Sequence, residues 1–110
     1  MDDGAKVINL SLSSPYDLDI EDAIENAYNH NVSIACATGN DSLSSIRYPA
    51  SNNLTIAVGA SNQQDLRCTF SNYGTGLDIV APGDQIYVQG TSSNSFISVG
   101  GTSIAAPMVS

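Results

Sequence analysis

Apolar and polar positions along the chain form segments that predict strands and helices. Residues 6–12 alternate between apolar and polar positions, which predicts a β-strand. Apolar residues recur at helical spacing over residues 19–30, which predicts an amphipathic helix. Residues 32–37 are mostly apolar, as expected for a strand that is covered on both faces. A strand, a helix and a strand in this order predict two parallel strands joined by a right-handed crossover.

The rest of the chain extends this pattern. Four more segments predict short strands, the last two as a hairpin across a turn rich in Gly, Ser and Asn: residues 54–59, 77–81, 85–88 and 95–99. Small residues from Gly100 onward lead into a helical segment. We therefore predict an α/β fold with a partial parallel sheet, flanking helices and a β-hairpin. No repeat or linker divides residues 1–110.

Polar residues mark both ends of the first predicted helix. Acidic residues near its start suit the positive end of the helix dipole and are interpreted as a solvated helix start: Asp17, Asp19, Glu21 and Asp22. His30 lies in the last turn and is predicted to face solvent. Asn31 can adopt the left-handed conformation that ends many helices.

Composition excludes several classes of partner. The 110 residues suffice for one core, and 11 acidic residues against 3 basic ones give a net charge of −8. This charge argues against binding to nucleic acids or to anionic membranes, and no apolar run is long enough to span a bilayer. Charged residues make up only 13%, so extra chain or a partner is expected to cover part of the surface. Cys36 and Cys68 are predicted to be free structural thiols, and no metal site is expected.

Ser103 is a candidate nucleophile. Two glycines precede it and small helix formers follow it, which predicts a tight turn that enters a helix. A hydroxyl at this place is exposed at the positive end of the helix dipole, which suits a nucleophile that passes through an anionic intermediate. A Ser before a helix is also a common N-cap, so this motif alone leaves both interpretations open.

Asn40 is a candidate donor to an oxyanion. It follows the predicted strand 32–37, and sites in open α/β sheets lie outside the carboxyl ends of the strands. Its side-chain amide could stabilise a negatively charged oxygen. The alternative is an ordinary Asn in a turn after Gly39.

Taken together, these segments resemble a known family. Residues 101–107, Gly-Thr-Ser-Ile-Ala-Ala-Pro, closely resemble the nucleophile motif of the subtilisin-like serine peptidases (subtilases), and residues 37–40, Ala-Thr-Gly-Asn, resemble their oxyanion segment. Further blocks match in family order: residues 7–12, 48–50, 56–60, 70–74 and 77–83. The resemblance implies part of a three-layer subtilisin-like fold and a serine endopeptidase that cleaves polypeptides through an acyl-enzyme.

The resemblance also implies roles for individual residues. Ser103 attacks the scissile carbonyl, and the Asn40 side chain and the Ser103 N–H bind the oxyanion. Two segments form walls of the specificity pocket, and the substrate pairs with them as an added strand: Leu10, Ser11, Leu12 and Ser13, and Ala37, Thr38 and Gly39. Arg47 precedes Tyr48-Pro49 near the pocket floor and would favour an acidic side chain before the cut, unless it points outward as an exposed arginine. The family places a cis peptide at Tyr48-Pro49.

Two expected motifs do not occur in this sequence. The family needs an Asp and a His, in the chain order Asp, His, Ser. The sequence has no Asp or His motif of the family, and its single histidine, His30, lies in a segment that the family places away from the active site. We expect both residues upstream in a longer parent, and we expect the isolated chain to be inactive because Ser103 has no base. The alternative is a pseudo-enzyme or interaction module that binds peptides in the same groove.

The remaining expectations concern the parent and its surroundings. The strand at residues 6–12 would be an exposed edge, which predicts self-association or aggregation. The family implies a secreted parent and leaves a calcium requirement of that parent open; Asp78 resembles a residue near a weak cation site but is more simply a surface carboxylate. Met108 stands where many relatives have a structural His.

Overall fold

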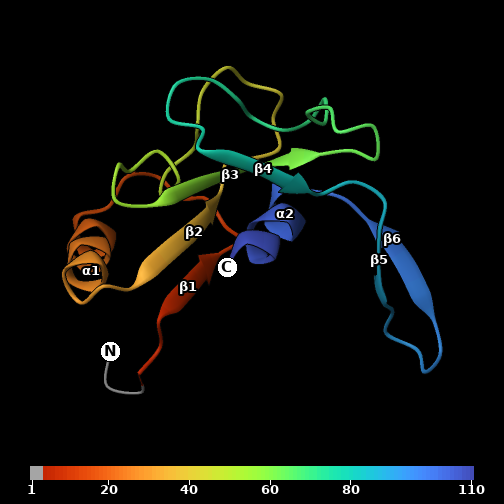
Figure 1. The fold of residues 1–110 in the computed structure, drawn as a ribbon, viewed down its shortest axis with the longest axis horizontal. Helices are drawn as coiled ribbons and strands as arrows, with labels where there is room; N and C mark the ends of the chain where they lie inside the picture. The colour runs from red at the N-terminus through yellow and green to blue at the C-terminus, as the bar shows by residue number, and fades with distance from the viewer. Residues whose placement is uncertain (1–3) are drawn as a thin grey trace.

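The computed structural model describes residues 4–110. Residues 1–3 of the undivided segment 1–110 lie outside the described part. Within these described residues, six strands and two helices follow one another: β1 (Val7–Leu10), α1 (Leu18–Asn29), β2 (Ser33–Ala37), β3 (Ile56–Ser61), β4 (Ile79–Pro82), β5 (Ile86–Gln89), β6 (Phe96–Val99) and α2 (Thr102–Val109). β1 to β4 form one sheet in sequence order, and every neighbouring pair is parallel. The predicted α/β fold with a parallel sheet is confirmed (Figure 1).

The two helices cover opposite faces of the sheet. On one face, Ala35 and Ala37 of β2 pack in a buried cluster with Ala105 and Ala106 of α2. On the other face, the alternate β2 residues Ile34 and Cys36 pack with Ile24 and Ala27 of α1. Because successive side chains of a strand point to opposite faces, a strand buried on both faces is apolar throughout. The structure therefore has three layers, with the sheet between the helices.

The ends of α1 follow from local hydrogen bonds. The carboxylate of Asp17 accepts a hydrogen bond of 2.8 Å from the Asp19 N–H, which satisfies one of the unpaired donors at the helix start. At the other end, Asn31 has a φ of 56°, and its N–H donates to the carbonyl of Tyr28. The left-handed conformation predicted for Asn31 is confirmed, and it turns the chain from α1 into β2.

Several strand boundaries differ from the predicted ones by one or two residues, and two of these differences have a clear local cause. β1 ends at Leu10 rather than at residue 12, because the chain beyond it turns towards the start of α2. β3 begins at Ile56 rather than at residue 54, because a turn occupies the preceding residues. In that turn, the Asn52 side chain accepts the Leu54 N–H at 2.7 Å, and its carbonyl accepts the Thr55 N–H.

The β5–β6 hairpin extends away from the sheet, at the opposite end of the molecule from α1 (Figure 1). The predicted hairpin is confirmed, and Tyr87 and Phe96 on it are exposed. A second apolar feature lies between β1 and α1, where an open groove of about 400 Å³ is lined by residues that include Ile8, Leu10 and Ile20. None of the described helices is both long and apolar enough to cross a membrane.

Candidate active site

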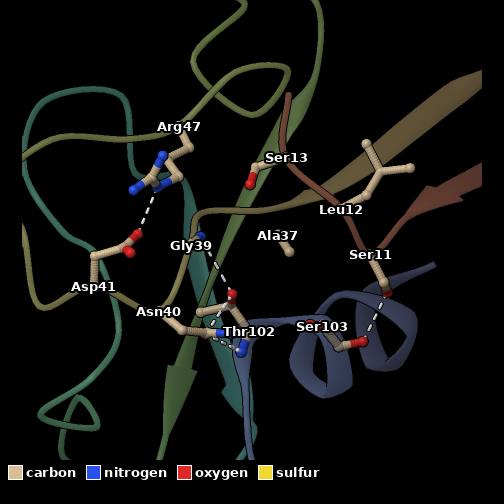
Figure 2. Close-up of a pocket in the computed structure, with 10 residues that line it drawn as sticks. All are labelled: Ser11, Leu12, Ser13, Ala37, Gly39, Asn40, Asp41, Arg47, Thr102 and Ser103. Carbon is tan, nitrogen blue, oxygen red and sulfur yellow. Dashed lines mark hydrogen bonds and ion pairs between the residues drawn. The ribbon is translucent and has the colours of Figure 1, made fainter. Parts of the chain in front are cut away.

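A pocket of about 300 Å³ opens where the ends of β1 and β2 meet the start of α2. Parallel strands present their carboxyl ends at the same edge of a sheet, which is the usual place for a site in this class of fold. Figure 2 shows the side chains around the pocket, which come from segments far apart in the sequence. Its lining residues are Ser11, Leu12, Ser13, Ala37, Gly39, Asn40, Asp41, Arg47, Thr102 and Ser103.

Ser103 lies in the first turn of α2, beside Gly101. N–H groups in the first turn have no acceptor within the helix, so the Ser103 N–H is available to a ligand. Gly101 has a φ of +151°, which side chains rarely adopt. A Cβ added at Gly101 would lie 3.4 Å from Asn40 Nδ2, 3.7 Å from Ser103 Oγ and 3.8 Å from Ser103 N. The nucleophile candidate and the two oxyanion-donor candidates therefore border one small space beside Gly101.

The carbonyl of Ser103 is held from outside the helix. Residue 107 would normally donate its N–H to this carbonyl, but Pro107 has no N–H. The hydroxyl of Ser11 donates to the Ser103 carbonyl instead, at 2.7 Å (Figure 2). The Asn9 side chain in turn donates to Ser11 at 2.9 Å. This chain of hydrogen bonds ties the end of β1 to the residue that carries the candidate nucleophile.

The side chain of Asn40 is oriented by Thr102. Its Oδ1 accepts the Thr102 N–H and the Thr102 hydroxyl, each at 2.8 Å. The Gly39 N–H donates to the same Thr102 hydroxyl at 3.2 Å. Because Oδ1 receives both donors, the Nδ2 group is left to face the space beside Ser103. The sequence carries no signal for this role of Thr102, although Thr102 stands directly before the candidate nucleophile.

Arg47 and Asp41 form an ion pair at the pocket (Figure 2). Arg47 Nε donates to a carboxylate oxygen of Asp41, and the side chains are 47% and 41% exposed. The hydrogen bond from Arg47 lowers the pKa of Asp41, and the one to Asp41 raises the pKa of Arg47. Arg47 therefore lines the pocket rather than pointing outward, but its charge is matched by a carboxylate that sequence reasoning did not consider.

The structure brings most of the predicted site residues together. Eight of them line the pocket, from the end of β1, the end of β2, the following loop and α2: Ser11, Leu12, Ser13, Ala37, Gly39, Asn40, Arg47 and Ser103. Two predicted wall residues do not line it. Thr38 is completely buried and donates its hydroxyl to the carbonyl of Asn72, and Leu10 lines the apolar groove between β1 and α1. The Thr38 side chain points away from the pocket because it alternates with Ala37 and Gly39 along an extended chain.

Other candidate residues lie elsewhere. His30 Nδ1 is 2.7 Å from the carbonyl of Asn26 at the end of α1, and the pocket lining contains no histidine among the described residues. Cys36 and Cys68 are buried free thiols, and burial raises the pKa of Cys36 to about 11, so this thiol is inert at neutral pH. The Asp78 carboxylate accepts the Ala57 N–H at 2.8 Å. Within residues 4–110, no three His, Cys, Asp or Glu side chains gather where they could hold a metal.

The Tyr48–Pro49 peptide is cis, as the resemblance implied. Tyr48 follows Arg47 and donates its hydroxyl to Glu21 at 3.1 Å, and Asn52 donates to the other carboxylate oxygen at 2.9 Å. Burial and the nearby Glu21 raise the pKa of Tyr48 to about 12. Glu21 therefore joins α1 to the loop behind the pocket. The prediction that Glu21 is part of a solvated helix start did not include this contact.

Comparison with known proteins agrees with the resemblance found in the sequence. The profile of the Subtilase family matches residues 1–110. The chain is 47% identical over 106 residues to a cell wall-associated protease of Bacillus subtilis (strain 168), covering 96% of this chain and 12% of that protein. It is 46% identical over 108 residues to Subtilisin BL of Lederbergia lenta, covering 96% of this chain and 39% of that protein. The chain therefore spans well under half the length of these relatives.

Solved structures agree with the sequence comparison. The prenylagaramide maturation protease PagA superposes with a TM-score of 0.87 at 36% identity, covering 99% of this chain and 42% of that one. The PatG macrocyclase domain superposes with a TM-score of 0.89 at 33% identity, covering 98% and 35%. The family profile, the identities and the shared fold show that this chain belongs to the subtilase family of serine proteases.

Proposed function

We propose that this chain is the nucleophile-bearing part of a subtilisin-type serine endopeptidase that hydrolyses peptide bonds through an acyl-enzyme. The observation that carries the proposal is the convergence of three groups on one space: Ser103 Oγ, Ser103 N–H and Asn40 Nδ2 all lie within 4 Å of the position that a Gly101 Cβ would occupy. Membership of the subtilase family supports the reaction class.

In the proposed reaction, Ser103 Oγ attacks the scissile carbonyl carbon and its proton passes to a general base. The carbonyl oxygen becomes an oxyanion, which accepts hydrogen bonds from Asn40 Nδ2 and the Ser103 N–H. Both donors are fixed before the reaction, Asn40 by Thr102 and Ser103 by the first turn of α2, so little reorganisation is needed. The intermediate collapses as the C–N bond breaks, and the leaving amine takes the proton from the base. Water, deprotonated by the same base, then attacks the acyl-enzyme, which releases the carboxylic acid and restores the Ser103 hydroxyl.

We propose that the base and its orienting carboxylate are a His and an Asp supplied from outside this sequence. His30 is bonded at the end of α1, where it cannot serve Ser103. A serine without a base remains a weak nucleophile. The isolated 110-residue chain is therefore expected to be inactive, and a longer parent that adds both residues is expected to be active. By analogy with the named cell wall-associated protease, we place that parent outside the cytoplasm.

The proposed substrate is a polypeptide that pairs with the chain as an added strand. Ser11, Leu12 and Ser13 after β1, and Ala37 and Gly39 at the end of β2, line the pocket. Arg47 favours an acidic side chain before the cut, but only to the extent that the substrate carboxylate competes with Asp41 for the guanidinium. We therefore propose a moderate acidic preference that Asp41 limits.

Peptide hydrolysis by the longest native polypeptide that contains this sequence tests the proposal. A set of chromogenic peptides with varied residues before the cut would be compared for the wild type, Ser103→Ala and the control Ser93→Ala, which removes an exposed hydroxyl in the turn of the β5–β6 hairpin, outside the pocket lining. Hydrolysis that survives in the control and disappears in Ser103→Ala supports the proposal. Peptides that bind without being cleaved by the wild type would instead favour the peptide-binding module.

A further inference from the structure

Asn72 is a buried asparagine that contacts the loop on both sides of Asn40. It lies far along the chain from that loop, between β3 and β4, and is completely buried. Its Oδ1 accepts the N–H of Asp41 at 2.9 Å and the N–H of Leu43 at 3.0 Å. Its Nδ2 donates to the Thr38 carbonyl at 3.1 Å and to the Asp41 carboxylate at 3.4 Å. Two acceptor sites and two donor hydrogens are therefore all engaged.

The backbone of Asn72 strengthens the same connection. Its N–H donates to the Gly39 carbonyl at 3.0 Å, and its carbonyl accepts the Thr38 hydroxyl at 3.4 Å. A Cβ at Gly39 would lie only 2.5 Å from Asn72 Nδ2, so the loop passes directly against the buried amide. Gly39 also has a φ of +106°, which a residue with a side chain rarely adopts. The loop can approach Asn72 this closely because residue 39 is glycine.

Two residues position Asn40, and each one fixes a different part of it. Thr102 binds the Asn40 side chain and sets its rotation. Asn72 binds the backbone before and after Asn40 but does not bond to the Asn40 side chain. An oxyanion donor is effective only when its position is fixed to a fraction of an ångström, so both the rotation and the backbone position matter.

We propose that Asn72 is a positioning residue that fixes the oxyanion loop, residues 38–43, and acts on the reaction through Asn40. This inference rests on the proposed function, because it assigns Asn72 to the same reaction. Asn72 also binds Asp41, the partner of Arg47, so one buried side chain anchors both the oxyanion donor and the charged side of the pocket.

The kinetic test is a double-mutant cycle in the longest native polypeptide that contains this sequence. Asn72→Ala is expected to lower kcat about tenfold, because the Asn40 donor is displaced but not removed, while KM changes by less than about threefold. In an Asn40→Ala background, the same substitution is expected to lower kcat by less than about twofold, because there is no donor left to displace. A full tenfold loss in both backgrounds would overturn the proposal. So would an Asn72→Ala enzyme with the wild-type kcat.

A structural test needs no catalysis, so it separates this inference from the proposed function. It uses the longest native polypeptide that contains this sequence, made inactive by Ser103→Ala, because the isolated chain is expected to self-associate. NMR would follow the Asn40 side-chain amide and the hydrogen exchange of the Asp41 and Leu43 amides. Asn72→Ala is expected to shift the Asn40 signal and to remove the protection of both amides, while the β3 amides stay protected. An unchanged Asn40 signal, with Asp41 and Leu43 still protected, would overturn the inference even if the protease is active.

Two further variants keep this test decisive. Asn72→Ser leaves a smaller void and is expected to fold even if Asn72→Ala does not, with the same loss of protection at Asp41 and Leu43. Asn62→Ala is the matched control, because the Asn62 side chain also accepts two backbone N–H groups, from Gln64 at 3.0 Å and Leu66 at 3.1 Å, in a turn that does not line the pocket. It is expected to leave the Asn40 signal unchanged, and an equal shift in this control would contradict a specific role for Asn72.

Discussion

Replacing Thr102 by valine removes the hydroxyl that links the oxyanion loop to α2. Valine has nearly the same shape, so this completely buried site acquires no cavity. Two hydrogen bonds are lost: the one from the hydroxyl to Asn40 Oδ1 at 2.8 Å, and the one from the Gly39 N–H at 3.2 Å. The Thr102 N–H still donates to Asn40, so the asparagine keeps one of its two bonds.

The expected magnitudes follow from these contacts. Two lost hydrogen bonds at about 1 kcal/mol each lower the free energy of unfolding by about 2 kcal/mol. For a chain of this size that change corresponds to a melting temperature about 10 °C lower. In the proposed protease, the loss of one of the two hydrogen bonds that orient Asn40 is worth about 1 kcal/mol, or about a fivefold decrease in kcat. Removal of the whole oxyanion asparagine in this family has a larger effect, about 10²–10³-fold.

The assay has two parts. Thermal unfolding is measured on the 110-residue chain, and peptide hydrolysis is measured on the longest native polypeptide that contains this sequence. Thr102→Ser is the matched control, because it keeps the hydroxyl and is expected to retain most of the turnover. A Thr102→Val variant as stable and as active as the wild type would refute the reasoning. A serine variant that is as slow as the valine variant would also refute it, because the hydroxyl could then not be the cause.

Three more predictions address the space beside Gly101, the pocket charges and the sheet edge. Gly101→Ala is expected to lower hydrolysis at least about a hundredfold, because the methyl group intrudes between Ser103 and the oxyanion donor; near-normal turnover would contradict this. Arg47→Ser is expected to shift preference away from Glu and Asp before the cut, and Asp41→Asn to shift it towards them; a peptide panel unaffected by either change would count against a role for the ion pair. The isolated chain is expected to self-associate through the edge strand β1, with exposed Val7 and the groove beside it, and a monodisperse monomer in sedimentation would argue otherwise.

Much of the fold could be predicted from local patterns. The apolar run of β2 indicates burial on both faces, and the structure confirms it with α1 on one face and α2 on the other. The end of β1 could not be placed, because the alternation continues to residue 12. Ser11 lies outside β1 because of a contact with a distant part of the chain. Its hydroxyl donates to the Ser103 carbonyl, which receives no hydrogen bond within α2 because Pro107 has no N–H.

The candidate site could be predicted where its residues lie in short motifs. Two glycines precede Ser103, and Asn40 follows a buried strand, so each residue can be recognised from its neighbours in the sequence. The structure places both residues at the same pocket. Asn72 lies in the block 70–74 that resembles the family, but nothing in that block indicates a role for it at the site, and Asp41 has no such signal either. Their contributions arise only when the loop after β3 folds against the loop after β2, and no sequence pattern reports that contact.

Labelling with a fluorophosphonate probe, read out by mass spectrometry, tests the central claim most directly. Ser103 is expected to be labelled stoichiometrically in the longest native polypeptide that contains this sequence, because a base is then present to activate it. The isolated 110-residue chain is expected to remain unlabelled under the same conditions, although its pocket is formed. Labelling of Ser103 in the isolated chain, or no labelling of Ser103 in the longer polypeptide, would contradict the account.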